Sequence, residues 1–473
     1  MRARCGTLPC NDELPESYKK TYFPRIPNTK YQMSPMLTPE ERAQIIALIK
    51  EQVVPAIGCT EPICVALAVA RATEELGSLP VRIEAQLSAN ILKNAMGVGI
   101  PGTGMVGLPI AIALGAIVGR AAYGLEVLRD CTPEAVEQGK AYIAEDRIQI
   151  GLKEDAPSKL YVEIHTYDDE GHKAEVVIAH RHTHLIYIAR DGQATLDLRH
   201  TADCVSEAAA TQNEDAPLAL NMRKVYDFAT TAPLAEIEFI QEARRLNEAA
   251  AQQSLAGNYG HCLGQALSRP LGRGIMGDSI FSHILSSTGC ACDARMAGAM
   301  IPVMSNSGSG NQGICATNPV VVFAEENHNT NEEMIRALIL SHLTAIYIKQ
   351  HLGSLSALCG CVVASTGSSC GITYLMGGGY KQVAYSVKNM IANLAGMVCD
   401  GAKPACALKV TSGVSTAVLS AMLAIQNRHA TNAEGLIEDD VDHCIRNLTR
   451  IGASGMNETD RMVLDIMTHK SCK

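Results

Sequence analysis

The sequence is poor in aromatic residues and in charge for its length. Its 473 residues contain no Trp and only five Phe, and Asp, Glu, Lys and Arg together make up 19%. The net charge is −9 and no basic cluster occurs, which argues against nucleic acid or an anionic membrane as a partner. Hydrophobic residues reach 47%, so wholesale disorder is excluded. We expect roughly two to three folded domains that act on a small metabolite.

Charged residues are absent from three stretches, 95–119, 296–324 and 351–380, and each is long enough to cross a bilayer. A transporter is therefore an alternative. The first stretch, however, carries seven Gly and two Pro, and Ser, Asn and Gly clusters break the other two, so little unbroken helix remains. We expect no membrane-spanning segment.

The N-terminus lacks the charged and then apolar pattern of a signal peptide. Seventeen cysteines, an odd number, are spread along the chain without short regular spacing. Both features favour a reduced, cytoplasmic compartment. There, thiols serve as metal ligands or catalytic groups more often than they form disulfides.

Local patterns predict an α+β fold. Residues 1–35 are polar and without periodicity, so we expect an N-terminal extension. Within 36–205, alternating residues predict one strand at 80–88 and an antiparallel meander over 147–197. Helices over 39–76 and 108–143 should cover this mixed or antiparallel sheet. Strand signals nearly vanish after this point, so 206–473 should form a mostly helical domain.

Thiols in glycine-rich segments suggest a metal cluster in this helical domain. Cys399 and Cys406 flank Asp-Gly-Ala-Lys-Pro-Ala, and Cys359 and Cys361 lie upstream in Leu-Cys-Gly-Cys. Three thiolates can hold an iron–sulfur cluster and leave one iron open. Pro404 should open a helix with Cys406 in its first turn, where the helix dipole favours a thiolate. The alternative is that these cysteines are small buried hydrophobes.

Two glycine-rich loops could line a site. The segment 305–313, Ser-Asn-Ser-Gly-Ser-Gly-Asn-Gln-Gly, can present backbone N–H groups to a carboxylate or phosphate, unless it is a flexible surface loop. The segment 94–107 has dinucleotide-like glycine spacing, but Pro101 and Pro109 interrupt the frame. We expect it to provide close backbone packing instead. Cys59 and Glu61 share the turn Gly58–Pro62, where Cys59 is either a buried structural thiol or an active-site group.

These motifs resemble those of the L-cysteine desulfidases, relatives of the iron–sulfur L-serine dehydratases. The resemblance covers about 38–465, and it is carried by Gly58–Pro62, 94–103, 304–313 and Cys399–Cys406. It implies a [4Fe–4S] cluster whose protein ligands are Cys359, Cys399 and Cys406, with Cys361 as the rival of Cys359. It also implies that Cys59 occupies the position of a catalytic thiol. Four further cysteines match no ligand of the family and are expected to be packing residues: Cys290, Cys292, Cys315 and Cys370.

The resemblance implies elimination of sulfide from L-cysteine, which yields pyruvate, ammonia and hydrogen sulfide. We expect Cys59 to take the α-proton, with Glu61 as the alternative base. Cys472 could cap the open iron or belong to an exposed tail. The substrate carboxylate should lie on the loop formed by Ser305, Asn306, Ser307, Gly308, Ser309 and Asn311.

Three alternatives remain open at this point. An iron–sulfur serine dehydratase would share the fold and the cluster. A pyridoxal-phosphate lyase would use the 305–313 loop as a phosphate cup, but no lysine is marked for the Schiff base. A non-catalytic metal or thiol reservoir is the third, and a homodimer is a possible assembly.

Overall fold

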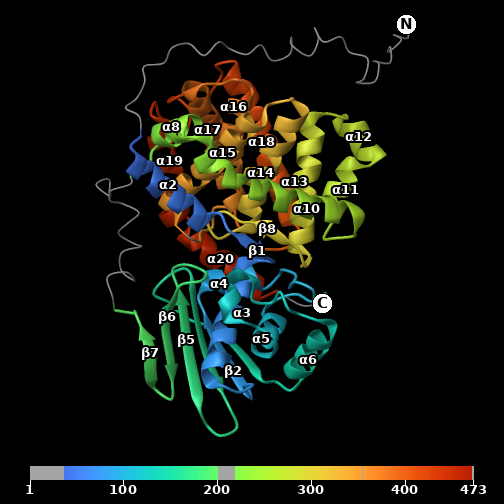
Figure 1. Ribbon diagram of the computed structural model, residues 1–473, viewed down its shortest axis with the longest axis vertical. Coiled ribbons are helices and arrows are strands. Elements are labelled where there is room, and N and C mark those ends of the chain that lie inside the picture. Colours follow the sequence, from blue (N-terminus) through green and yellow to red (C-terminus); the bar gives the residue numbers. More distant parts are fainter. Residues whose placement is uncertain (1–36, 201–218, 354, 471–473) are drawn as a thin grey trace.

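A computed structural model describes residues 37–200, 219–353 and 355–470. The expected extension 1–35, the expected domain boundary between 205 and 206, and Cys472 all lie outside the described residues. The described chain confirms the α+β class. A sheet-containing half lies below a larger helical half in the view of Figure 1.

The larger sheet has six strands in the order β3-β2-β4-β5-β6-β7. Its strands are β2 (Arg82–Leu87), β3 (Ile148–Leu152), β4 (Tyr161–Tyr167), β5 (Lys173–Ala179), β6 (Leu185–Arg190) and β7 (Gln193–Asp197). The predicted strands are confirmed, but β3 is not part of the predicted antiparallel meander. It pairs in parallel with β2, because the helices between the two strands provide the long crossover that parallel pairing needs.

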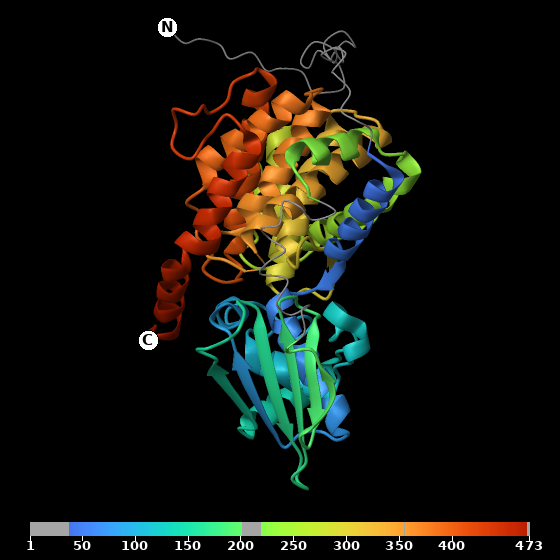
Figure 2. The same ribbon diagram turned by 90° about the vertical axis from the view of Figure 1, so that its left-hand side faces the viewer.

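Helices cover one face of this sheet, and Figure 2 shows the strands in front of them. They are α3 (Thr60–Leu76), α4 (Ala89–Ala95), α5 (Leu108–Ile117), η2 (Ala121–Glu126) and α6 (Pro133–Ala144). Helix α3 contacts β4 and β5 directly, and α5 packs on α3. The expectation that residues 39–54 also cover the sheet is wrong. Helix α2 (Pro39–Gln52) buries Ile45 and Ile49 in the core of the helical half, because α3 already occupies the sheet face.

The helical half is built around α16 (Gly360–Leu375), which contacts α14 (Gly310–Glu326), α15 (Asn331–Leu352) and α18 (Cys406–Ile425). The three charge-free stretches therefore contribute the buried helices α5, α14 and α16. Among the described residues, α18 alone is long and apolar enough to cross a membrane, and half of it is buried inside the protein. The other helices of this half are α8 (Met222–Thr231), α9 (Leu234–Ile237), η3 (Glu238–Ile240), α10 (Gln241–Ala256), α11 (Leu263–Ser268), α12 (Pro270–Met276), α13 (Ile280–Met296), α17 (Tyr380–Leu394), α19 (Val441–Arg450), η4 (Ile451–Gly455) and α20 (Asn457–Thr468).

A second, two-stranded sheet joins the two halves (Figure 1). Strand β1 (Pro55–Ile57) pairs antiparallel with β8 (Pro302–Met304), so that Ala56 faces Val303. Because these strands have only three residues each, they are too short to show a periodic pattern in the sequence. Their pairing places the turn after β1 beside the glycine-rich loop after β8.

Candidate active site

The loop after β8 is fastened to the segment before β1. Ser305 donates two hydrogen bonds to the carbonyl of Val54, one from its backbone N (2.9 Å) and one from Oγ (2.6 Å). The backbone N of Ser307 donates to the carbonyl of Gln52 (2.9 Å). The structure thus brings together the Cys59–Glu61 turn and the 305–311 loop, which are far apart in the sequence.

Glu61 is the centre of a buried polar group. Helix α3 begins at Thr60, with Cys59 as its N-cap, so the predicted turn ends earlier than Pro62. Oε2 of Glu61 accepts hydrogen bonds from the Cys59 thiol (3.0 Å) and from the Thr60 hydroxyl (3.0 Å). Oε1 accepts a third from Nδ2 of Asn94 (3.2 Å). Asn94 lies on α4, so this contact comes from a helix and not from a loop. The glycine-rich loop that follows α4 packs its backbone against the end of α13, where Gly99 N donates to Met296 O (3.1 Å).

The protonation states of Cys59 and Glu61 are opposite. Burial raises the pKa of the Cys59 thiol well above its usual value, and the neighbouring Glu61 carboxylate raises it further. Burial alone would also raise the pKa of Glu61, but His182 in its protonated form, the hydrogen bond from Cys59 and the Arg295 guanidinium lower it below its usual value. Cys59 is therefore a protonated hydrogen-bond donor in this structure. Its role as a base stays a prediction.

Side chains of the 305–311 loop mostly brace the loop itself. Nδ2 of Asn306 lies 3.1 Å from both Nδ1 and the carbonyl O of His342, and the Ser307 hydroxyl donates to Oδ1 of Asn306 (2.8 Å). Burial lowers the pKa of His342 to about 3, so this brace stays neutral. Direct contact of Ser305, Asn306 or Ser307 with a substrate stays a prediction. The backbone N–H groups of Ser305, Asn306, Ser307 and Ser309 are all bonded within the protein, so the donors left for a ligand include the first N–H groups of α14.

Arg295 adds a positive charge beside this loop. It is 2% exposed and lies near the C-terminal end of α13, where its Nε donates to the carbonyl of Gly58 (3.1 Å). A Cβ atom at Gly310 would overlap this guanidinium, so the side chain packs directly on the start of α14. The first N–H groups of a helix have no partner within the helix, and they carry the positive end of its dipole. The loop, the start of α14 and Arg295 can together bind a carboxylate.

The thiols implied as cluster ligands gather at one place in the helical half. Leu358 and Val398 form an antiparallel bridge, and Cys359 N donates to Met397 O (2.9 Å), so Cys359 and Cys399 follow paired backbone segments. Cys359 caps the start of α16, and Cys406 is the first residue of α18, as predicted. Two of the three thiols therefore lie at helix N-termini, which favour a thiolate.

Cys359 and its rival Cys361 have different surroundings. Their sulfur atoms are 2.9 Å apart, and this hydrogen bond from Cys361 lowers the pKa of Cys359 to about 7. The same contact, together with burial, raises the pKa of Cys361 well above its usual value. Burial and repulsion from Cys359 raise the pKa of Cys399 to about 11, and burial raises that of Cys406. Metal ligation requires deprotonation of one thiol of this pair, and either sulfur can be the donor of the shared hydrogen bond, so Cys359 as the ligand stays a prediction.

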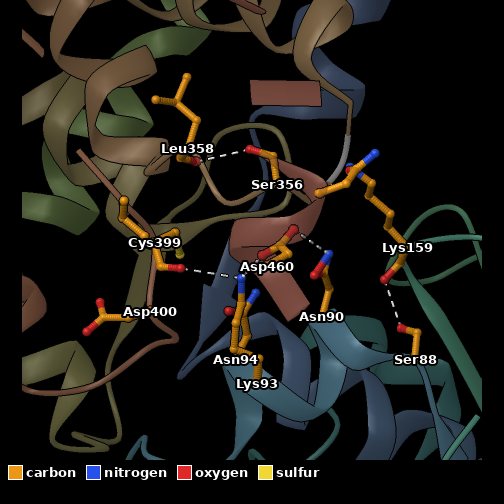
Figure 3. Close-up of polar contacts among 12 residues, drawn as sticks. Ser88, Asn90, Lys93, Asn94, Lys159, Ser356, Leu358, Cys399, Asp400 and Asp460 are labelled. Atoms are coloured by element: carbon orange, nitrogen blue, oxygen red, sulfur yellow. Dashed lines mark hydrogen bonds and ion pairs between the residues drawn. The ribbon is translucent and has the colours of Figure 1, made fainter. Parts of the chain in front are cut away.

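Two lysines connect the thiols to the rest of the site. Nζ of Lys93, on α4, donates to the carbonyl of Cys399 (3.4 Å), and Figure 3 shows this carbonyl pointing toward α4. Lys349, on α15, is partly buried, and burial lowers its pKa to about 8, while Cys399, Glu61 and Cys359 are all close enough to raise it. The thiols and Glu61 therefore border one polar region.

Cysteine thiolates are the usual protein ligands of iron–sulfur clusters, so the donor chemistry of Cys359, Cys399 and Cys406 is compatible with a cluster. Within the described ranges, no group of three or more His, Cys, Asp or Glu side chains could hold one metal ion. A cluster distributes its protein ligands over several irons, so its thiolates are spaced more widely than the ligands of one ion. The other cysteines expected to be packing residues are fully buried, namely Cys290, Cys292, Cys315 and Cys370.

Sequence patterns contain no signal for several polar residues of the site. His182, Arg295, Lys349 and His342 come from three separate elements, since Lys349 and His342 both lie on α15, and none lies in a motif with recognisable spacing. For Arg295 and Lys349, a cation in a mostly apolar part of its helix was the available clue.

A fold and a site of this kind are those of an iron–sulfur lyase related to the serine dehydratases. Residues 122–465 match the family model "Serine dehydratase alpha chain", and the chain belongs to this family. It is also similar to proteins named UPF0597. One of them, from Bacteroides thetaiotaomicron, is 68% identical over 430 residues, and the alignment covers 91% of this chain and 98% of the relative. Another, from Oleidesulfovibrio alaskensis, is 47% identical over 435 residues, and the alignment covers 92% of this chain and 100% of the relative.

Substitutions at Cys359 and Cys361 should show which of the two thiols is the cluster ligand. Cys361→Ala should keep iron and acid-labile sulfide near the wild-type content, because the expected ligand is Cys359. Cys359→Ala should lose most of both. Iron and sulfide analysis of anaerobically purified protein measures this. The reverse pattern would make Cys361 the ligand.

Proposed function

We propose that the protein is a [4Fe–4S]-dependent carbon–sulfur lyase that converts L-cysteine into pyruvate, ammonia and hydrogen sulfide. The observation that carries this proposal is the position of the three thiols. Cys359, Cys399 and Cys406 lie together, and Lys349 is near enough to both Cys399 and Glu61 for their charges to affect its pKa. A cluster held there would border a polar region with carboxylate-binding groups.

The substrate's carboxylate fits the start of α14. Arg295 is a buried cation whose Nε donates to the carbonyl of Gly58. The remaining nitrogens of its planar guanidinium can bind a carboxylate. The backbone N–H groups after Ser309 face the same place. Held there, an amino acid would have its α-carbon near the Glu61 group and its β-substituent directed to the thiols.

Cysteine is favoured over serine by the chemistry of the leaving group. An iron–sulfur cluster with an open iron supplies a Lewis acid, and a thiolate is a softer ligand than a hydroxyl. The residues of this chain orient the amino acid, and they move its α-proton. Serine is the second candidate, because the matching family model is that of a serine dehydratase chain.

The decisive experiment compares the two amino acids on anaerobically reconstituted protein. L-Cysteine should give equal amounts of pyruvate and hydrogen sulfide, with kcat/KM at least about tenfold above that for L-serine, which corresponds to ~1.4 kcal/mol of differential transition-state binding. Pyruvate from serine alone would establish the dehydratase. Pyruvate from neither would favour the metal or thiol reservoir.

A further inference from the structure

His182 reaches into the candidate site from the sheet half. It lies on the turn between β5 and β6, at the end of the sheet that faces the helical half (Figure 1). The preceding residue holds this turn in place, since Nη1 of Arg181 donates to Oε1 of Glu51 on α2 (2.5 Å). The imidazole packs on Gly308, where an added Cβ would lie 2.7 Å from Nδ1. Gly308 also has φ +77°, so glycine is doubly required there.

The imidazole is buried, but one of its nitrogens is unused. His182 is 8% exposed, and its Nε2 has no hydrogen-bond partner in the described part of the chain. Buried polar atoms are nearly always paired, so an unpaired one at the edge of the site is available to a ligand. Oδ1 of Asn94 and Oε1 of Gln312 are likewise buried without a partner among the described residues. Asn94 contacts Glu61, and Gln312 lies beside Gly360, next to Cys359.

We propose that His182 is the general base that takes the α-proton of the amino acid. This inference rests on the proposed function, and it names the proton acceptor of that same site. Nε2 forms the new N–H bond, and the C–H electron pair becomes the double bond between the α- and β-carbons. The bond between the β-carbon and sulfur breaks, and its electron pair leaves with sulfur as sulfide.

The other two candidates for the base are already engaged. The two oxygens of Glu61 accept three hydrogen bonds from Cys59, Thr60 and Asn94, which stabilise the carboxylate and weaken it as a base. Cys59 is the donor of one of these bonds and keeps its proton. Glu61 is then suited to stabilise the imidazolium that His182 becomes, as a carboxylate does beside a catalytic histidine.

The surroundings of His182 keep its imidazole neutral, which is the state that a general base needs. It faces Glu61 on α3, Lys349 on α15 and Arg295 on α13. Burial lowers the pKa of His182, the two cations lower it further, and Glu61 opposes them. The imidazole is therefore neutral at pH 7. The value of kcat/KM should fall only when the pH drops through this lowered pKa, and that acidic limb should disappear in His182→Gln.

Exchange of the α-proton tests the base separately from elimination. L-Alanine has no leaving group, so its exchange in D2O, followed by NMR, reports proton removal alone. In the cluster-loaded protein, His182→Gln should lower this exchange and sulfide release from L-cysteine by ~10²–10⁴-fold, the usual contribution of a general base. The dissociation constant of L-alanine, measured by calorimetry, and the iron content should stay near wild type.

His184→Gln is the matched control, because it makes the same change on the same turn, and it should retain wild-type exchange. Added imidazole should partly restore exchange in His182→Ala, which a merely structural role would not allow. A wild-type protein that releases sulfide, together with an equally active His182→Gln, would overturn the base and leave the proposed function standing. Absence of both exchange and elimination in the loaded wild-type protein would overturn the two together.

Discussion

Replacing Cys399 with Ser should leave a folded protein that has lost the cluster's absorbance and releases sulfide at least ~10³-fold more slowly. A serine hydroxyl does not deprotonate as a thiol does, so one of three ligands is lost. A Lewis acid at the leaving group contributes several kcal/mol of transition-state stabilisation, and each ~1.4 kcal/mol is tenfold in rate. The fold should survive, because the backbone bond from Cys399 N to Ala357 O (2.6 Å) does not involve the thiol.

Cys370→Ser is the matched control for this substitution. Cys370 is fully buried inside α16, and the Ser386 hydroxyl donates to its sulfur (3.9 Å), so a serine there keeps a partner. It should retain both iron and activity. An active, iron-free Cys399→Ser would contradict the cluster assignment, whereas loss of iron in both variants would show only that the helical core tolerates no change.

Local patterns predicted where the helices and strands lie better than they predicted which elements pack against one another. The alternating residues of β2, β4, β5 and β6 gave these strands correctly, since side-chain alternation is a local property. The elements that α2 packs against could not be predicted in this way. Ile45 and Ile49 are spaced for one buried helix face, but this spacing is the same whether the face meets a sheet or other helices.

The site was predictable where its residues share a short motif. Cys359, Cys399 and Cys406 lie close enough for their charges to interact, and their role as cluster ligands stays a prediction. The loop after β8 adjoins the turn with Cys59 and Glu61. The short pair β1 and β8 that creates this adjacency gave no signal. His182 and Arg295 reach the site through the packing of the two halves, and tertiary contacts of this kind leave no periodic trace in one sequence.

Lys93→Met should be the most destabilising of the substitutions considered. Nζ of Lys93 lies 2.5 Å from Oδ1 of Asp460 on α20, and the side chains are 1% and 10% exposed. Nδ2 of Asn90 donates to the other oxygen of this carboxylate (3.4 Å), as Figure 3 shows. Removing the lysine leaves a buried carboxylate with one weak hydrogen bond, from Asn90, so the free energy of unfolding should fall by ~3–5 kcal/mol. Urea unfolding followed by circular dichroism measures this change.

Lys159→Met provides the comparison, because Lys159 also contacts η4 and α20. Nζ of Lys159 donates to the carbonyl of Ala453 and to Oδ1 of Asn457 (both 3.0 Å), so its removal leaves neutral partners and should cost ~1 kcal/mol. A similar loss in both variants would show that the ion pair has no special weight.

A double variant separates the two contacts of Lys93. Lys93→Met with Asp460→Leu removes the unpaired charge, so unfolding stability should return to near wild type. The hydrogen bond from Lys93 to the Cys399 carbonyl stays absent in both variants, however, and this bond holds the backbone of a cluster ligand. Iron should therefore be lost to a chelator faster than in wild type in the double variant as well as in the single one. If the double variant recovered stability and iron retention together, Lys93 would act through the ion pair alone.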